Sequence, residues 1–356
     1  MSASGTSSLL DRLGVARPIV QAPMAGVSSP AMAAAVSSAG ALGSLGLGAT
    51  DAAGARAMIA AVRERSQGPL HLNVFSHAPA KADARKETAW TERLRPEFEA
   101  LEAKPPQALR EIYRSFAQDD DMLAALVAER PTAVSFHFGL PAPERIRALR
   151  EAGIFLMGSA TSLAEAKVAA AAGVDAIIAQ GFEAGGHRGV FDPDAPDDQL
   201  GTLALTRILV RELDLPVIAA GGIMDGAGIA AALRLGAAAT QLGTAFVATD
   251  ESLADAGYRA ALFSDAAHHT TMTRAISGRL ARSLSNRFTR LSATVQPGDI
   301  PAYPIAYDLG KALHAAGKAK GEFGFGAQWA GQGAPLARAM PAAKLVATLA
   351  AELEQA

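Results

Sequence analysis

Cysteine is absent from the chain of 356 residues, which excludes disulfides, thiolate nucleophiles, iron–sulfur clusters and cysteine-ligated zinc. Aromatic residues are scarce: they make up 5% of the chain, although 50% of it is hydrophobic. Alanine and glycine therefore supply much of the apolar content. This favours helices packed closely on a sheet over an aromatic-rich β-sandwich.

Long basic runs and long uncharged apolar runs are missing as well. The formal net charge is −2 and no long basic run occurs, so we expect no nucleic-acid partner. No uncharged apolar stretch reaches the roughly 18 residues of a membrane span, because the nearest candidate, 216–248, contains Asp225 and Arg234. The N-terminal MSASGTSSLLDRLG has no basic region followed by an apolar core, which predicts no secretory signal and a cytoplasmic protein.

Short apolar segments alternate with Ala- and Leu-rich segments of helical period. The expected strands are 18–24, 41–48, 70–76, 133–140, 154–161, 176–181, 216–222 and 239–247. The expected helices are 30–39, 51–66, 143–152, 162–172, 202–213, 225–235 and a closing helix at 335–354. Near-continuous apolar strands separated by helices indicate a parallel sheet buried on both faces. Eight such units predict an α/β fold of the TIM (β/α)₈ barrel type, and a doubly wound open sheet is the alternative that periodicity leaves open.

Two regions interrupt this repeat. Residues 78–120 are charged and hold Trp90 and Tyr113, and they are too long for an ordinary strand-to-helix loop. Residues 263–330 follow the eighth expected strand. We expect both regions to pack together as a second, smaller, mainly helical cap that binds substrate over the barrel mouth. The predicted barrel domain then comprises 1–77, 121–262 and 331–356.

Glycines follow the last two expected strands, where barrels of this type tend to bind phosphate. Gly221 and Gly222 end the seventh strand, and Gly243 and Thr244 lie in the eighth. Glycines let backbone N–H groups approach an anion closely, so this pattern predicts a phosphate site. The alternative is that the glycines serve turns and packing only. Asp225 is predicted to cap the next helix, because its charge would oppose phosphate.

Polar side chains stand at the ends of other expected strands. The first strand ends in QAPM (21–24), and Asn73, Ser135, His137 and Gln180 end later ones. Amide side chains offer both donors and acceptors, which suit the edge of a flat heterocyclic ligand. Each amide by itself is better explained as a satisfied buried group, so their convergence on one rim is what indicates a ligand.

Other motifs predict no site. GLGATD (46–51) has Asp51 where the dinucleotide fingerprint needs glycine. His268 and His269 are adjacent, so on a helix they would diverge by about 100° and would not share a metal. We therefore expect no metal site.

The stretch QGFEAGGHRG (180–189) places His187 directly after two glycines. One interpretation is a reactive histidine on a loop that runs close to a ligand. The alternative is a histidine that only fixes the loop through a backbone hydrogen bond. Glu183 and Arg188 are predicted to order the loop rather than to react.

Five stretches carry a family resemblance: QAPMAGVSSP (21–30), SFHFGLP (135–141), QGFEAGGHRG (180–189), AAGGIMDG (219–226) and QLGTAF (241–246). Together they resemble the class I nitronate monooxygenases, formerly called 2-nitropropane dioxygenases, and the similarity runs from about residue 15 to QWAGQG (328–333). The resemblance implies an FMN-dependent TIM barrel with a smaller helical domain. It also implies oxidation of alkyl nitronates by O₂ to a carbonyl compound and nitrite, without a nicotinamide, with propionate 3-nitronate as the physiological substrate.

The matching motifs imply roles for particular residues. His187 would be the catalytic residue, with a pKa near its ordinary value of about 6.5, and would hydrogen-bond the nitro oxygens or take a proton from a neutral nitroalkane. Gly185 and Gly186 would let the loop lie against the flavin, where a Cβ would clash. The substrate-binding residues would be His137, Tyr303, Tyr307 and Lys311. The FMN-binding residues would be Ala22, Pro23, Met24, Asn73, Gln180, Gly185, Gly186, Gly221, Gly222, Gln241, Leu242, Gly243 and Thr244.

Two other functions are compatible with the same barrel. One is an FMN-dependent NAD(P)H:quinone or enoyl reductase, and the other is a non-catalytic protein that binds a phosphate ligand. The expected partners are a small nitronate and O₂, with no membrane or nucleic acid, and the expected assembly is a monomer or a small homo-oligomer.

Overall fold

The computed structural model describes residues 9–356, and its main sheet has eight parallel strands in the order β1-β9-β8-β6-β5-β4-β3-β2. The strands are β1 (Ile19–Gln21), β2 (Gly43–Gly46), β3 (Leu70–Phe75), β4 (Ala133–His137), β5 (Phe155–Ala160), β6 (Ala176–Gln180), β8 (Val217–Ala220) and β9 (Ala239–Leu242). The two outer strands meet, because Val20 bridges Leu42 and the Gln21 N–H donates to the Leu42 carbonyl at 3.0 Å. The sheet is therefore a barrel, and the open-sheet alternative is wrong.

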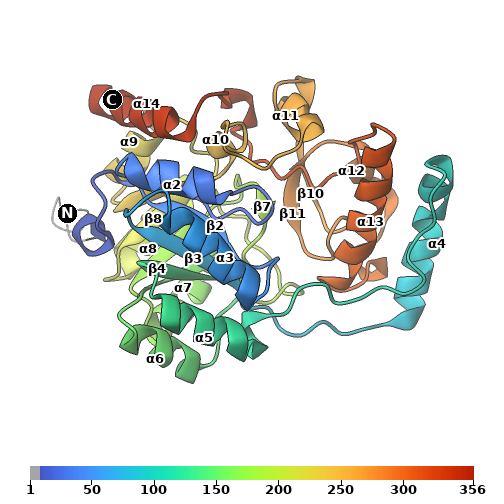
Figure 1. Ribbon diagram of the computed structural model, residues 1–356, viewed down its shortest axis with the longest axis horizontal. Coiled ribbons are helices and arrows are strands. Elements are labelled where there is room, and N and C mark those ends of the chain that lie inside the picture. The colour runs from blue at the N-terminus through green and yellow to red at the C-terminus, as the bar shows by residue number, and fades with distance from the viewer. Residues whose placement is uncertain (1–8) are drawn as a thin grey trace.

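Helices surround the barrel (Figure 1). They are α2 (Pro30–Ser38), α3 (Ala52–Arg63), α5 (Asp120–Glu129), α6 (Pro143–Glu151), α7 (Leu163–Ala172), α8 (Thr202–Glu212), α9 (Gly226–Arg234) and α14 (Ala342–Gln355). Side-chain caps fix several of their starts. Asp225 accepts from the Gly228 N–H at 2.8 Å, so its predicted role as the cap of α9 is confirmed.

The expected strands and helices all occur, but two boundaries are wrong by more than three residues. The closing helix expected at 335–354 is α14, which begins only at Ala342, directly after Pro341. The strand expected at 239–247 ends at Leu242, and Thr244–Val247 forms the short helix α10. Ala245 and Phe246 of this helix are buried in the core. A short buried apolar run looks the same in a strand and in a helix, so periodicity could not separate the two.

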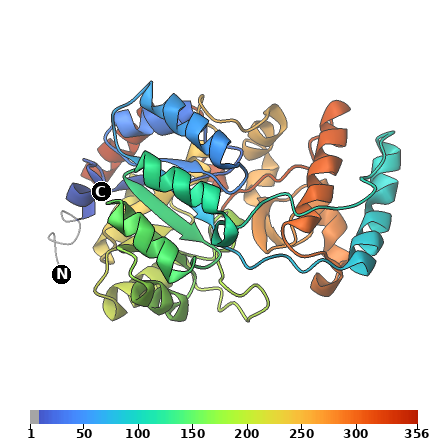
Figure 2. The same cartoon turned by 60° about the horizontal axis from the view of Figure 1, so that its bottom comes forward.

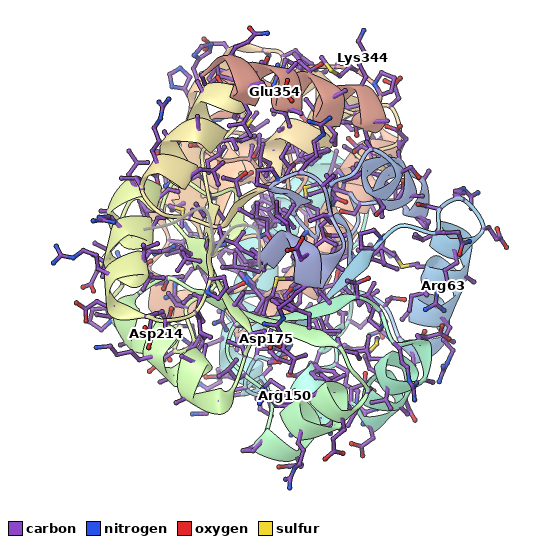
Figure 3. All side chains as sticks on the ribbon, turned by 90° about the vertical axis from the view of Figure 1, so that its left-hand side faces the viewer. Arg63, Arg150, Asp175, Asp214, Lys344 and Glu354 are labelled. Carbon is purple, nitrogen blue, oxygen red and sulfur yellow. The ribbon has the colours of Figure 1, made fainter. Side chains whose placement is uncertain are left out.

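The barrel is closed at the end away from its cap. Leu9 and Leu13 pack against Val20, Phe155 and Met157 in one hydrophobic cluster. Figure 3 views the molecule from this side, with Asp175 near the middle and Arg63, Arg150 and Asp214 farther out around it. Asp175 fixes one of the connections here, since its carboxylate accepts from the Leu156 N–H at 2.9 Å and pairs with Arg12 at 2.6 Å.

The two regions that interrupt the repeat pack against each other. Trp90 and Leu94 of α4 (Ala84–Ala100) share a hydrophobic cluster with Leu309 and Leu313 of α13 (Ile305–Ala319) and with Phe325. Figure 2 shows α4 and α13 side by side, away from the barrel helices. The packing agrees with the expected cap, and its status as a separate domain stays a prediction. Helices α11 (Ala256–Leu262) and α12 (Arg287–Leu291) complete this side of the molecule.

A small antiparallel sheet that the sequence did not predict joins the cap to the barrel. Its strands are β10 (Thr270–Thr273), β11 (Ala281–Leu284) and β7 (Gly186–His187). In the register, His187 pairs with Ala281 and Gly186 with Arg282. The loop after β6 is therefore held as a strand by the cap, and this sets the position of His187. Across residues 9–356, none of the helices combines the length and the apolar character that crossing a membrane requires.

Candidate active site

A cavity of about 460 Å³ opens at the carboxyl ends of the barrel strands and extends to the cap. Active sites of this barrel class lie at this end. The predicted site residues that border the cavity are Ala22, Pro23, Met24, Asn73, His137, Gln180, Gly185, Gly186, His187, Gly221, Gly222, Gln241, Gly243, Thr244, Tyr303, Tyr307 and Lys311. Leu242 does not border it: its side chain packs with Ile19 and Met32, and its carbonyl accepts from the Ala22 N–H at 2.7 Å.

A buried hydrogen-bond chain supports Asn73 from beneath. The Asn73 amide donates to the Ser135 hydroxyl at 2.8 Å, and His71 lies between the hydroxyls of Ser135 (2.7 Å) and Ser44 (2.8 Å). Complete burial lowers the pKa of His71 to about 3, so the ring is neutral at neutral pH. No motif or period marked His71 in the sequence, because it lies inside an apolar strand.

The Gln180 amide holds the loop that carries His187. Its nitrogen donates to the His187 carbonyl at 2.9 Å, and its oxygen accepts from the Gly189 N–H at 2.7 Å. Arg188 adds a second anchor: it is buried, it forms two bonds to Asp197 at 2.7 and 2.8 Å, and it donates to the Gln180 carbonyl at 2.6 Å. The loop is thus fixed by side chains on both sides of His187.

Glu183 holds the start of the same loop on the first turn of α8. Its carboxylate accepts from the backbone N–H of Thr202 at 2.7 Å and from the Thr202 hydroxyl at 2.9 Å. The contacts of Glu183 and Arg188 agree with the loop-ordering roles predicted for them.

The glycines of this loop serve backbone packing. A Cβ on Gly185 would lie 2.4 Å from the Gly331 nitrogen and 2.5 Å from the Ala330 carbonyl carbon. Gly186 has a left-handed φ of 76°, which favours glycine, and a Cβ there would meet the Trp329 side chain only at 3.9 Å. The backbone of residues 330–331 therefore already excludes a Cβ at Gly185, and the expectation that the loop also lies against a ligand stays a prediction.

His187 lies in an aromatic cage with Phe138, Tyr303 and Trp329, whose ring centroids are 5.6, 5.4 and 5.1 Å from its own. Burial, together with nearby His137 and Arg279, lowers the pKa of His187 to about 3. The expectation of a pKa near 6.5 is corrected accordingly. The ring is neutral at neutral pH and is a weak base.

Four tyrosines and two lysines border the cavity: Tyr113, Tyr258, Tyr303, Tyr307, Lys311 and Lys318. Lys311 donates to the Tyr113 hydroxyl at 2.7 Å and lies over the rings of Tyr113 and Tyr307, at 5.2 and 5.7 Å from their centroids. The Tyr303 hydroxyl is buried and has no hydrogen-bond partner within residues 9–356. Burial raises the pKa of Tyr303 well above its ordinary value, so the hydroxyl keeps its proton.

Two residues beside His187 were missed by the sequence reasoning. The Ser277 hydroxyl lies 2.8 Å from the His187 Nε2, and Ser277 is fully buried. Arg279 is also buried, and its guanidinium carbon lies 4.1 Å from the centroid of Phe138. Both residues stand in a turn between β10 and β11 that has no period or motif, so no sequence signal marked them.

The comparisons with known proteins identify the family of the chain. A profile of the family described as Nitronate monooxygenase matches residues 6–352. The chain belongs to the nitronate monooxygenase family. A nitronate monooxygenase of Paraburkholderia phytofirmans is 61% identical over 352 residues, covering 99% of this chain and 96% of that protein. One of Pseudomonas aeruginosa is 52% identical, covering 96% and 97%.

Solved structures share the whole fold of this family member. A nitroalkane oxidase from Streptomyces ansochromogenes superimposes with a TM-score of 0.89 at 42% identity, covering 98% of both chains. FabK from Thermotoga maritima has a TM-score of 0.75 at 29% identity, covering 98% of this chain and 96% of that one. Nitronate monooxygenases are oxidoreductases and in general depend on a flavin. Membership therefore excludes the alternative of a non-catalytic binding protein.

Acid is expected to destabilise this nitronate monooxygenase partly through His71. Its pKa of about 3 in the fold lies below the ordinary 6.5, so the unfolded chain binds a proton that the folded chain does not. The stability that neutral His71 contributes is complete above pH 6.5 and is lost as the pH falls, by about 1.4 kcal/mol per pH unit. We expect the unfolding free energy of wild type, measured in urea, to fall between pH 6 and pH 5. In His71→Gln this fall should be smaller than in wild type by about this amount.

The exposed His269 provides the matched control. A change in slope shared by His71→Gln and His269→Gln would come from removing a histidine as such, and only the difference between the two variants is assigned to the burial of His71. An equal slope in wild type and His71→Gln would mean that His71 is protonated in the folded protein.

Proposed function

We propose that this family member catalyses the FMN-dependent oxidation of alkyl nitronates with O₂ to a carbonyl compound and nitrite. Propionate 3-nitronate is the proposed physiological substrate, and no nicotinamide takes part. The observation that carries the proposal is the cavity itself, where a neutral histidine and Lys311, a cation without a carboxylate partner in the described chain, border the same space as the glycine-rich strand ends in a chain of this family.

The strand ends fit FMN. The Gln241 oxygen is fully buried and has no hydrogen-bond partner within residues 9–356, so it is an acceptor that an N–H of the flavin ring would satisfy. When bound, FMN would supply the redox chemistry, and the protein would supply position and electrostatics. The residues assigned to hold FMN are Ala22, Pro23, Met24, Asn73, Gln180, Gly185, Gly186, Gly221, Gly222, Gln241, Gly243 and Thr244.

The cap side of the cavity suits an anion. Lys311 and Tyr303 border it. Arg279 lies behind Phe138, near enough to His187 to lower its pKa, and has no carboxylate within ion-pair distance in the described chain. A buried cation without a carboxylate partner is costly unless another negative group approaches, so this field favours a negative substrate. Because His187 is a weak base, a preformed nitronate, which needs no deprotonation, is expected to react faster than the neutral nitroalkane.

The test is a visible spectrum of the purified protein before and after anaerobic addition of propionate 3-nitronate. The proposal expects a flavin spectrum that changes on addition, followed by nitrite release when air is admitted. A flavin that nitronate leaves unchanged but NADH bleaches would instead favour the quinone or enoyl reductase. Absence of flavin, even after FMN is supplied, would contradict the assignment of the strand ends.

A further inference from the structure

We propose that Ser277 is a positioning residue that fixes the tautomer of His187, with the proton on Nε2 and the lone pair of Nδ1 directed to the substrate. The inference rests on the proposed function only for its kinetic consequence. The tautomer itself is a property of the chain.

The hydrogen-bond partners of Ser277 decide where its single hydroxyl proton goes. Its Oγ lies 3.1 Å from the Arg279 carbonyl oxygen and 2.8 Å from His187 Nε2. The carbonyl can only accept, and within residues 9–356 it has no other donor. If the hydroxyl donated to His187 instead, the Arg279 carbonyl would be left without a donor in a fully buried turn, which is costly.

With the hydroxyl proton on the Arg279 carbonyl, the Ser277 oxygen can only accept from His187. The imidazole therefore carries its proton on Nε2, and Nδ1 is unprotonated, because the ring is neutral. Nδ1 has no hydrogen-bond partner in the described chain, and it is not among the fully buried polar atoms that lack one. His187 borders the cavity, so Nδ1 is the nitrogen left for a ligand.

The Ser277 oxygen is itself held in place. The turn that carries it closes with a bond from the Gly278 N–H to the Arg274 carbonyl at 2.7 Å. On the other side, the His187 carbonyl accepts from Gln180 at 2.9 Å, so the loop and the turn meet in a fixed geometry. The His187 ring is held at Nε2 and the His187 backbone is held at its carbonyl, so Nδ1 points in one direction only.

This arrangement matters for one class of substrate. With a neutral nitroalkane, the proton on the carbon next to the nitro group moves to Nδ1, and the electron pair of that C–H bond stays on the substrate as the nitronate. A preformed nitronate needs no such step. Loss of the tautomer should therefore slow nitroalkanes and spare nitronates, whereas general damage to the site would slow both.

The experiment compares Ser277→Ala, Ser277→Thr and wild-type holoenzyme with a nitroalkane and with its nitronate. We expect Ser277→Ala to lower kcat/KM for the nitroalkane about tenfold or more and for the nitronate less than about threefold. Ser277→Thr keeps a hydroxyl and should restore most of the nitroalkane activity. Ser292→Ala is the matched control, because Ser292 also makes two side-chain hydrogen bonds in this region but lies outside the cavity.

A second readout needs no turnover. Two-bond ¹H–¹⁵N correlation spectra of ¹⁵N-histidine-labelled holoenzyme distinguish the tautomers, with His187 assigned by the loss of its signals in His187→Asn. Wild type should show the proton on Nε2, and Ser277→Ala a mixture. A wild-type proton on Nδ1, an unchanged tautomer in Ser277→Ala, or equal losses for both substrates would overturn the inference. If wild type oxidises no nitronate, the proposed function fails, and the spectra alone decide the role of Ser277.

Discussion

Replacing Gly185 by alanine is expected to lower the free energy of unfolding by about 3 kcal/mol or more. The added Cβ would lie 2.4 Å from the Gly331 nitrogen, 2.5 Å from the Ala330 carbonyl carbon and 2.8 Å from its Cα. These are backbone atoms, which cannot rotate away as the end of a side chain would. Gly331 is also held in place, since its N–H donates to the Thr244 hydroxyl at 3.0 Å. Urea unfolding of the variant and wild type, each with and without FMN, measures the effect.

Gly298 offers a control with the same chemical change. A Cβ there meets no atom within 4 Å, and its φ is not in the left-handed region, so Gly298→Ala should change the unfolding free energy by less than about 0.5 kcal/mol. The comparison also separates two reasons for the glycine. If Gly185→Ala kept the stability of the flavin-free protein and lost only FMN binding, contact with the cofactor would be the reason, and our interpretation would be wrong.

The barrel could be predicted because its information is local and repeated. Strands such as 176–181 are continuous apolar runs, and parallel strands buried on both faces require that pattern. The N-terminal residue that caps helix α9 could be predicted for the same reason, since Asp225 is only three residues from Gly228, whose N–H donates to it. The strand end at Leu242 could not be located, because the apolar residues that follow it are buried in a helix.

The chemistry around His187 could be predicted only in part. The loop glycines and His187 are adjacent in the sequence, so their motif was visible. Ser277 lies 90 residues away and reaches His187 through a small sheet whose strand β7 has 2 residues, too short to leave a period. The pKa was missed for the same reason, because burial by Tyr303, Trp329 and the cap is a property of the assembled chain.

The low pKa also changes what His187 can contribute. A histidine with a pKa of about 3 is almost entirely in its neutral form, with a single ring proton, at neutral pH, so it cannot act as a cation that attracts the nitronate. That attraction falls to Lys311 and Arg279, while the imidazole keeps a lone pair for proton transfer. Anion binding and proton acceptance are thus assigned to different side chains, and one substitution should be able to separate them.

His187→Asn is expected to lower kcat/KM for a neutral nitroalkane by about 10²–10⁴-fold, the usual range for loss of a positioned acid or base. The asparagine amide cannot accept a proton at neutral pH. FMN should stay bound, because the loop is held by Gln180, Arg188 and Glu183 rather than by the imidazole ring. A preformed nitronate should lose far less, since Lys311 and Arg279 remain to attract it. Steady-state kinetics with both substrates, and the ratio of flavin to protein absorbance, measure these effects.

His268→Asn is the matched control, because His268 is exposed and outside the cavity, and it should leave both substrates unaffected. The difference between the nitroalkane and the nitronate in His187→Asn decides the role of the ring. Equal losses for nitroalkane and nitronate would mean that the ring shapes the site without taking a proton, and loss of flavin would make it a structural residue. A loss confined to the nitroalkane would leave the lone pair of His187 as the group that accepts the proton, because the aromatic cage and the cations are the same in both reactions.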